Sequence, residues 1–204
     1  MPRNTKVNTT MSNNVNMTTT LLVRAKDDQR IATALHEAGH AVAYLALDKP
    51  FSHMEIDAVS DYVGQLAVVP GSMISALDRA NTAMTGPVSE AFMYRGTIEP
   101  SPATVDLIRS SHAEHWDYVD SEPDHEGGHD FDDVGEYFAA SLPWALTLVT
   151  HNWPVIERIA AAALHSTEHL SYDQIQGIAG AMPMLDLAVW QSWETAIKGY
   201  PVSG

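Results

Sequence analysis

Two histidines four residues apart, with a glutamate directly after the first, are the feature that most constrains this chain. On a helix, His36 and His40 lie on one face with Cβ atoms about 5–6 Å apart. Both imidazoles can therefore reach one ion at about 2.0–2.1 Å. Glu37 points to the side of the pair, where it can act on a water held by that ion. The segment predicts a helix that carries a zinc site with Glu37 as the general base.

The flanking residues favour this helix and predict it over residues 29–47. Apolar side chains recur at spacings of three and four, Asp27 or Asp28 can cap the start, and Lys49–Pro50 provides a stop. Gly39 costs about 1 kcal/mol relative to Ala in a helix, so we expect a neighbouring element or a substrate to need the space above it. The apolar stripe consists of Ile31, Ala34, Leu35, Ala38, Ala41, Val42, Leu45 and Ala46.

The bland alternative is an amphipathic helix with two incidental histidines. A second match to the same pattern, His125–Glu126–Gly127–Gly128–His129, follows Pro123 and has no apolar stripe around it. Because the two glycines oppose helix by about 1 kcal/mol each, we interpret it as a solvated acidic loop, with an extra metal-binding loop as the alternative. We expect the remaining histidines to be surface or core residues; they are His53, His112, His115, His151, His165 and His169.

Composition narrows the class of protein. The 204 residues suffice for one well-buried domain, which we place at residues 23–204 after an Asn/Thr-rich, disordered tail over 1–22. The net charge of −15 argues against nucleic acid as a partner, because phosphate binding needs clustered Lys and Arg. The chain has no cysteine, so any zinc must be held by His and carboxylates.

The chain contains no run of 18 apolar residues and no secretory signal at its start. We therefore expect no membrane span and a cytoplasmic location.

The periodicity along the chain predicts a mainly α fold with a small β-hairpin. We expect Gly86–Pro87 to kink the second helix or to divide it into two, Pro143 to kink a later one, and Ser171 to cap the helix that follows it. The predicted strands are 54–59 and 62–69. The predicted helices after the first are 73–95, 101–115, 130–150, 155–165, 172–181 and 183–200, with a loop over 116–128 and a break at 151–154.

Four blocks of sequence resemble, in the right order, the peptidase domain of FtsH-type zinc metallopeptidases, the membrane AAA proteases. The first, His-Glu-Ala-Gly-His-Ala at 36–41, matches the metal helix of that family to the letter. The second, at 86–91, resembles the family's Gly-Arg-Ala-Ala-Glu helix. The third is 128–131, and the fourth is 152–160 followed by Leu170 and Ile175. The resemblance covers about residues 29–180 and implies a zincin-like metallopeptidase fold.

The resemblance also implies further site residues. The third metal ligand of the family corresponds to Asp130, with Asp133 as the substitute; the alternative role for Asp130 is a helix N-cap. Glu90 matches a family glutamate, to which we assign the orientation of a ligand histidine. These assignments predict a three-ligand Zn²⁺ site that keeps a position open for water.

The chain also differs from FtsH-type peptidases in several ways, and these differences indicate a stand-alone relative of that family. The chain has no phosphate-binding loop of the GxxxxGK[ST] type and no membrane anchor, Pro87 replaces the family's Arg, and the 100–128 segment is longer. The sequence thus predicts a stand-alone, ATP-independent zinc peptidase that acts on a peptide or unfolded protein. A separate ATPase chain or a homo-oligomer is compatible with this. The alternatives are a catalytically weak or inactive metal-binding or protein-interaction module of the same fold, and an all-helical interaction protein without a metal.

Overall fold

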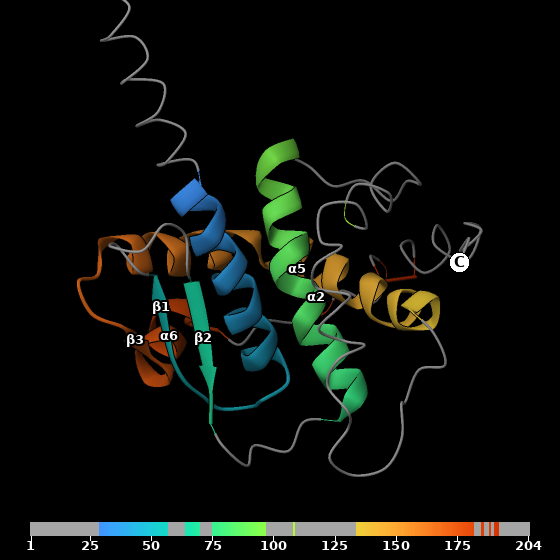
Figure 1. Ribbon diagram of the computed structural model, residues 1–204, viewed down its shortest axis with the longest axis horizontal. Coiled ribbons are helices and arrows are strands. Elements are labelled where there is room, and N and C mark those ends of the chain that lie inside the picture. The colour runs from blue at the N-terminus through green and yellow to red at the C-terminus, as the bar shows by residue number, and fades with distance from the viewer. Residues whose placement is uncertain are drawn as a thin grey trace, which may run out of the picture.

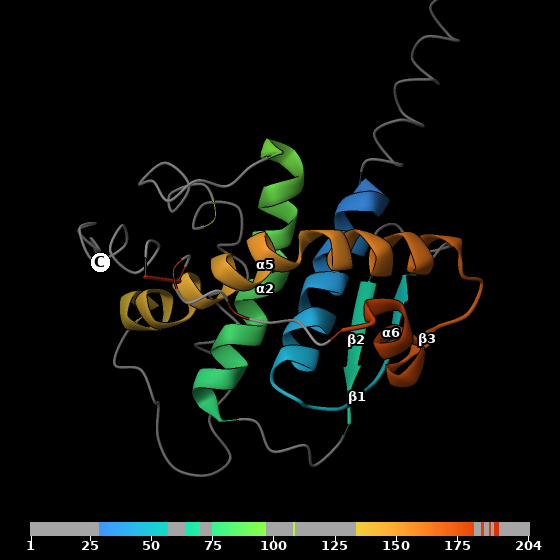
Figure 2. The same cartoon turned by 180° about the vertical axis from the view of Figure 1, so that it is seen from behind.

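The computed structural model describes residues 29–56, 64–69, 75–96 and 134–181, and residues 108, 185, 188, 190 and 191. A first helix covers residues 29–46 and is called the 29–46 helix below. It lies between a small sheet on one side and helix α2 (Ala76–Arg95) on the other, and α5 (Val134–His165) crosses behind it (Figures 1 and 2). The mainly helical fold with a small sheet is therefore confirmed for the described residues. None of the described helices has the length and apolar character needed to cross a membrane.

The sheet has three antiparallel strands in the order β2-β1-β3, with β1 (Phe51–Ile56) in the middle. The predicted hairpin corresponds to β1 and β2 (Gly64–Val68), in which Met54 pairs with Leu66. The first strand begins earlier than predicted because the ring of Phe51 is buried, 5.0 Å from that of Tyr172. The two-residue strand β3 (Leu170–Ser171) was not predicted.

We predicted either a kink or a division into two helices at Gly86–Pro87. Helix α2 runs through both residues as one helix, so the division is wrong. Ser75 caps its start by accepting a hydrogen bond from the backbone N–H of Asp78 at 3.1 Å, and Gly96 ends it with φ 73°. Proline removes only one backbone donor from the ladder. Burial of the middle of α2 against its neighbours stabilises the helix enough to continue past that gap.

Helix α5 covers two of the predicted helices, which meet at a kink. The predicted break at 151–154 is a bend at Asn152, where φ is −108° and ψ is 16°. The Asn152 side chain donates to the carbonyl oxygen of Leu148 at 2.9 Å, and Pro154 leaves one carbonyl of the preceding turn without its helical partner. The ring of Trp153 stacks on Phe92 of α2 with centroids 4.4 Å apart, which fixes the bend against α2.

Helix α6 (Tyr172–Ala179) begins at the predicted cap, where Ser171 and Gln174 form a reciprocal capping box. It ends at Ala179, two residues before the predicted end, and Gly180 is its C-cap. Arg158 of α5 donates to the carbonyl oxygen of Ala179 at 3.2 Å, so the end of α6 is tied to α5. This hydrogen bond joins the two helices to each other, and β3 ties the connection between them to the sheet.

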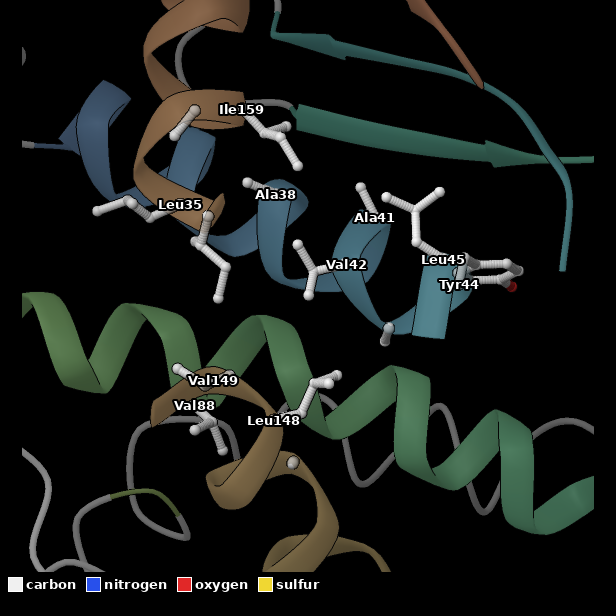
Figure 3. Close-up of a cluster of buried hydrophobic side chains, with 14 of the residues drawn as sticks. Leu35, Ala38, Ala41, Val42, Tyr44, Leu45, Val88, Leu148, Val149 and Ile159 are labelled. Atoms are coloured by element: carbon white, nitrogen blue, oxygen red, sulfur yellow. The ribbon is translucent and has the colours of Figure 1, made fainter. Parts of the chain in front are cut away.

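The 29–46 helix is the centre of the core. Ala38, Val42 and Leu45 are fully buried, and Figure 3 shows its apolar side chains among Val88 of α2 and Leu148, Val149 and Ile159 of α5. Ile31 of the predicted stripe is an exception, because 39% of it is exposed. A helix buried on several sides is a rigid support for any side chain it carries.

Several predicted segments lie outside the described residues. They are the tail over 1–22, the loop over 116–128, all of the predicted helix 101–115 except the buried, helical Ile108, and most of the predicted helix 183–200.

Candidate metal centre

The two histidines of the first motif lie side by side on the 29–46 helix. The ring centroids of His36 and His40 are 4.8 Å apart and the rings are nearly perpendicular, at 78°. Both residues are partly buried, and the side chain of His36 is 13% exposed. The helix thus brings the two imidazoles together as the four-residue spacing predicted.

The Nδ1 atom of each ring is held by an oxygen of α2. His40 Nδ1 lies 2.7 Å from the carbonyl oxygen of Thr82. Since a carbonyl only accepts, Nδ1 donates and the neutral ring has its unprotonated nitrogen at Nε2, the form that binds metals. His36 Nδ1 lies 3.4 Å from Oε2 of Glu90. This is the contact that the predicted orienting role of Glu90 requires.

The two Nε2 atoms converge on α2 at Gly86. A Cβ atom at this position would lie 2.5 Å from Nε2 of His40 and 2.6 Å from Nε2 of His36. Both nitrogens are therefore close to one point, and only glycine leaves that point clear. Paired Nε2 donors whose Nδ1 atoms are held by a carbonyl and a carboxylate are the arrangement in which histidines bind zinc, so the described residues fit this metal.

Gly39 explains how α2 comes so close. A Cβ at residue 39 would clash with Oγ of Ser89 and lie 2.6 Å from the carbonyl oxygen of Thr85. The space above Gly39 is thus occupied by a neighbouring element. Small residues on both helices bring the carbonyl of Thr82 and the carboxylate of Glu90 within reach of the rings.

Glu37 is buried between the 29–46 helix and the sheet, with 8% of its surface exposed. Burial raises the pKa of its carboxyl above the ordinary value of 4.5. The nearby charge of His36 and a hydrogen bond from the backbone N–H of Leu66 lower the pKa, but they weigh less than burial. A carboxylate with a raised pKa accepts a proton more readily near neutral pH.

The predicted third ligand lies outside the described residues. This holds for Asp130, for its substitute Asp133 and for the whole second motif at 125–129. Within the described ranges, no group of three or more His, Cys, Asp or Glu side chains is arranged to hold a metal ion. The described part of the centre therefore consists of the ligand candidates His36 and His40, the buried carboxyl group of Glu37, and the contacts that Thr82 and Glu90 of α2 make with the two rings.

The sequence did not predict that the carbonyl oxygen of Thr82 contacts His40. Every residue has a carbonyl group, and no side chain indicates which one will make such a contact. One signal was present in α2. Thr82, Thr85 and Ser89 recur at spacings of three and four on an otherwise apolar segment, and all three are buried. Such a stripe of small polar residues indicates a face that contacts another backbone closely.

Comparison with protein-family models and with curated proteins gave no match for this chain. The resemblance of the four sequence blocks to FtsH-type peptidases therefore stays a prediction.

Proposed function

We propose that the protein is a zinc-dependent peptidase. The observation that carries the proposal is the convergence of the His36 and His40 Nε2 atoms beside Gly86. The buried carboxylate of Glu37, one residue along the same helix, supports it. Two imidazole ligands and an adjacent glutamate form the minimal set for metal-assisted hydrolysis.

In this proposal, each residue has one role. His36 and His40 hold the ion together with Asp130, the ligand that the family resemblance implies, or Asp133 in its place. When bound, zinc lowers the pKa of a water ligand and polarises the substrate carbonyl. A carboxylate oxygen of Glu37 takes the proton of the attacking water and passes it to the leaving amine. Glu90 orients His36 through Nδ1.

The proposed substrate is an extended peptide or an unfolded protein segment. Strand β2 is at the edge of the sheet and lies beside the 29–46 helix (Figure 1). Outward-facing backbone groups of an edge strand can pair with an added strand. In β2 the N–H of Leu66 donates to Glu37, and in this proposal a peptide pairs with the other outward-facing backbone groups of the strand.

The family type is also part of the proposal. A stand-alone zincin-like peptidase of the FtsH type, in the cytoplasm, agrees with the four sequence blocks and the missing phosphate-binding loop. A separate ATPase chain or self-association would then supply whatever delivery of substrate the protein needs.

The test is Glu37→Gln, which keeps the size of the side chain but removes its capacity to accept a proton. The variant is expected to bind about one zinc per chain and to lose roughly 10²–10⁴-fold in peptidase rate. Zinc content and cleavage of a peptide library, with and without a chelator, are measured for both proteins. Equal cleavage by wild type and Glu37→Gln would rule out this mechanism. Zinc binding by the wild type without any cleavage would favour the metal-binding module.

The third ligand is tested alongside. Asp130→Ala is expected to weaken zinc binding far more than Asp133→Ala. The reverse order would assign the role to Asp133, and no effect from either would direct attention to Glu90 or His129.

A further inference from the structure

Strand β2 closely contacts the 29–46 helix at Gly64. A Cβ atom at this position would lie 2.6 Å from Cγ of Glu37 and 3.1 Å from its Oε1. It would also lie 2.6 Å from Cγ2 of Thr33, one helical turn earlier. Carbon atoms in contact are normally about 3.5–4.0 Å apart, so no residue larger than glycine fits here without displacing Glu37 or Thr33.

Thr33 is not free to give way by rotation. Its hydroxyl donates to the carbonyl oxygen of Gln29 at 3.1 Å, within the same helix. That hydrogen bond fixes the rotamer and leaves the Cγ2 methyl group against Gly64.

The same strand also holds the carboxylate directly. The backbone N–H of Leu66, two residues after Gly64, donates to Glu37. N–H groups alternate in direction along a strand. Because the Leu66 N–H points to Glu37, those of its neighbours Gln65 and Ala67 point to β1, where these residues pair with Glu55 and His53.

We propose that Gly64 is a positioning residue for Glu37. It lets β2 approach until the Leu66 N–H reaches the carboxylate, and together the two residues hold Glu37 at the edge of the sheet. The role in catalysis rests on the proposed peptidase function. The positioning contact itself can be tested without activity.

The first test is Gly64→Ala in the full chain. The variant is expected to keep about one zinc per chain and to lose about 10²-fold in kcat, the cost of a misplacement near 1 Å, with KM changed much less. The matched control is Gly177→Ala in α6, where a Cβ meets no atom within 4 Å and kcat should be unchanged. A wild-type kcat in Gly64→Ala would overturn the proposal.

A second substitution tests whether crowding is the cause. Thr33→Ser removes the Cγ2 methyl group but keeps the hydroxyl that donates to Gln29. Alone it should leave kcat unchanged. Combined with Gly64→Ala it should restore at least part of the lost kcat, because the new methyl group gains space away from Glu37. Lack of any rescue, with both proteins folded, would contradict crowding at Glu37.

Hydrogen exchange of the Leu66 amide gives a measurement that needs neither zinc nor substrate. Glu37→Ala should accelerate this exchange roughly 10-fold or more, as expected for loss of a hydrogen bond to a charged group, and leave Ala67 unaffected. Gly64→Ala should accelerate Leu66 exchange as well, and Thr33→Ser should partly reverse it. Unchanged Leu66 exchange in either Glu37→Ala or Gly64→Ala would overturn the proposal whatever the activity. An inactive wild type whose Leu66 exchange responds as expected would instead refute the peptidase function and leave the contact established.

Discussion

Among the described residues, two pairs of histidine rings lie at almost the same distance from each other. The centroids of His36 and His40 are 4.8 Å apart, and those of His53 and His169 are 4.7 Å apart. The first pair lies between two helices, and the second lies at the sheet, with His53 in β1 and His169 just before β3. Distance alone would rank the two pairs as equal candidates for a metal site.

Their surroundings separate them. Oxygens of α2 hold both Nδ1 atoms of the first pair, and both Nε2 atoms converge at Gly86. In the second pair His169 is exposed, and Nδ1 of His53 lies 3.0 Å from the hydroxyl of Ser52. A hydroxyl can donate or accept, so it does not select one tautomer. The comparison teaches that a metal site needs a fixed tautomer and a common point as well as spacing.

The largest expected effect is on zinc retention. Replacing His36 or His40 by Ala should abolish the retention of about one zinc per chain, because a three-ligand site cannot spare one of its ligands. Replacing His53 and His169 together should leave the stoichiometry unchanged. Metal analysis after gel filtration gives the ratio for each variant. Stoichiometric zinc in a His36→Ala, His40→Ala double variant would refute the site, and loss of zinc in the His53→Ala, His169→Ala variant would move it to the sheet.

An intermediate effect is expected from Gly86→Ala, which crowds the first pair without removing a ligand. The new methyl group would lie about 2.5 Å from both Nε2 atoms, so the rings must turn and break their contacts with Thr82 or Glu90. Zinc affinity should fall about 100-fold, near the upper end of effects from groups around the ligands. Competition with a fluorescent chelator measures it. Gly177→Ala is the control, because it adds a methyl group at an exposed helix position. If Gly86→Ala bound zinc with wild-type affinity, the convergence of the two Nε2 atoms at Gly86 would be refuted as the basis of the site.

The sequence predicted the parts of the site that lie on one element. The 29–46 helix has a clear apolar period, and four-residue spacing places His36 and His40 on one face whatever the rest of the chain does. The β1–β2 hairpin and the Ser171 cap were predictable for the same reason, since each depends on neighbouring residues.

The rest depends on contacts between elements. Strand β3 has two residues, too few for any periodicity, and it exists because Met54 and Leu170 pair across the sheet. Helix α2 continues through Pro87 because it is buried on both sides, which local propensity does not register. The close contacts at Gly64 and Gly86 involve residues 27 or more positions away in sequence, so only the folded structure reveals them.

The smallest expected effect is on thermal stability, and it concerns the glutamate near each histidine pair. Glu37 follows His36 and is buried, whereas Glu55 lies in β1 with His53 and is exposed. Because burial raises the pKa of Glu37 above 4.5, the folded metal-free protein binds its proton more tightly than the unfolded chain does. This contribution to stability is complete below the unfolded pKa and is lost as the pH rises through the folded pKa.

Glu37→Gln should therefore raise the Tm of the metal-free protein at pH 7, relative to wild type, and the difference should shrink toward pH 4. A gain of a few degrees is the expected scale, since 1 kcal/mol shifts Tm by about 2–4 °C in a chain of this length. Glu55→Gln, which removes an exposed carboxylate from β1, is the control. A Glu37→Gln protein that is less stable than wild type at pH 7 would show that the surroundings of Glu37 stabilise its carboxylate.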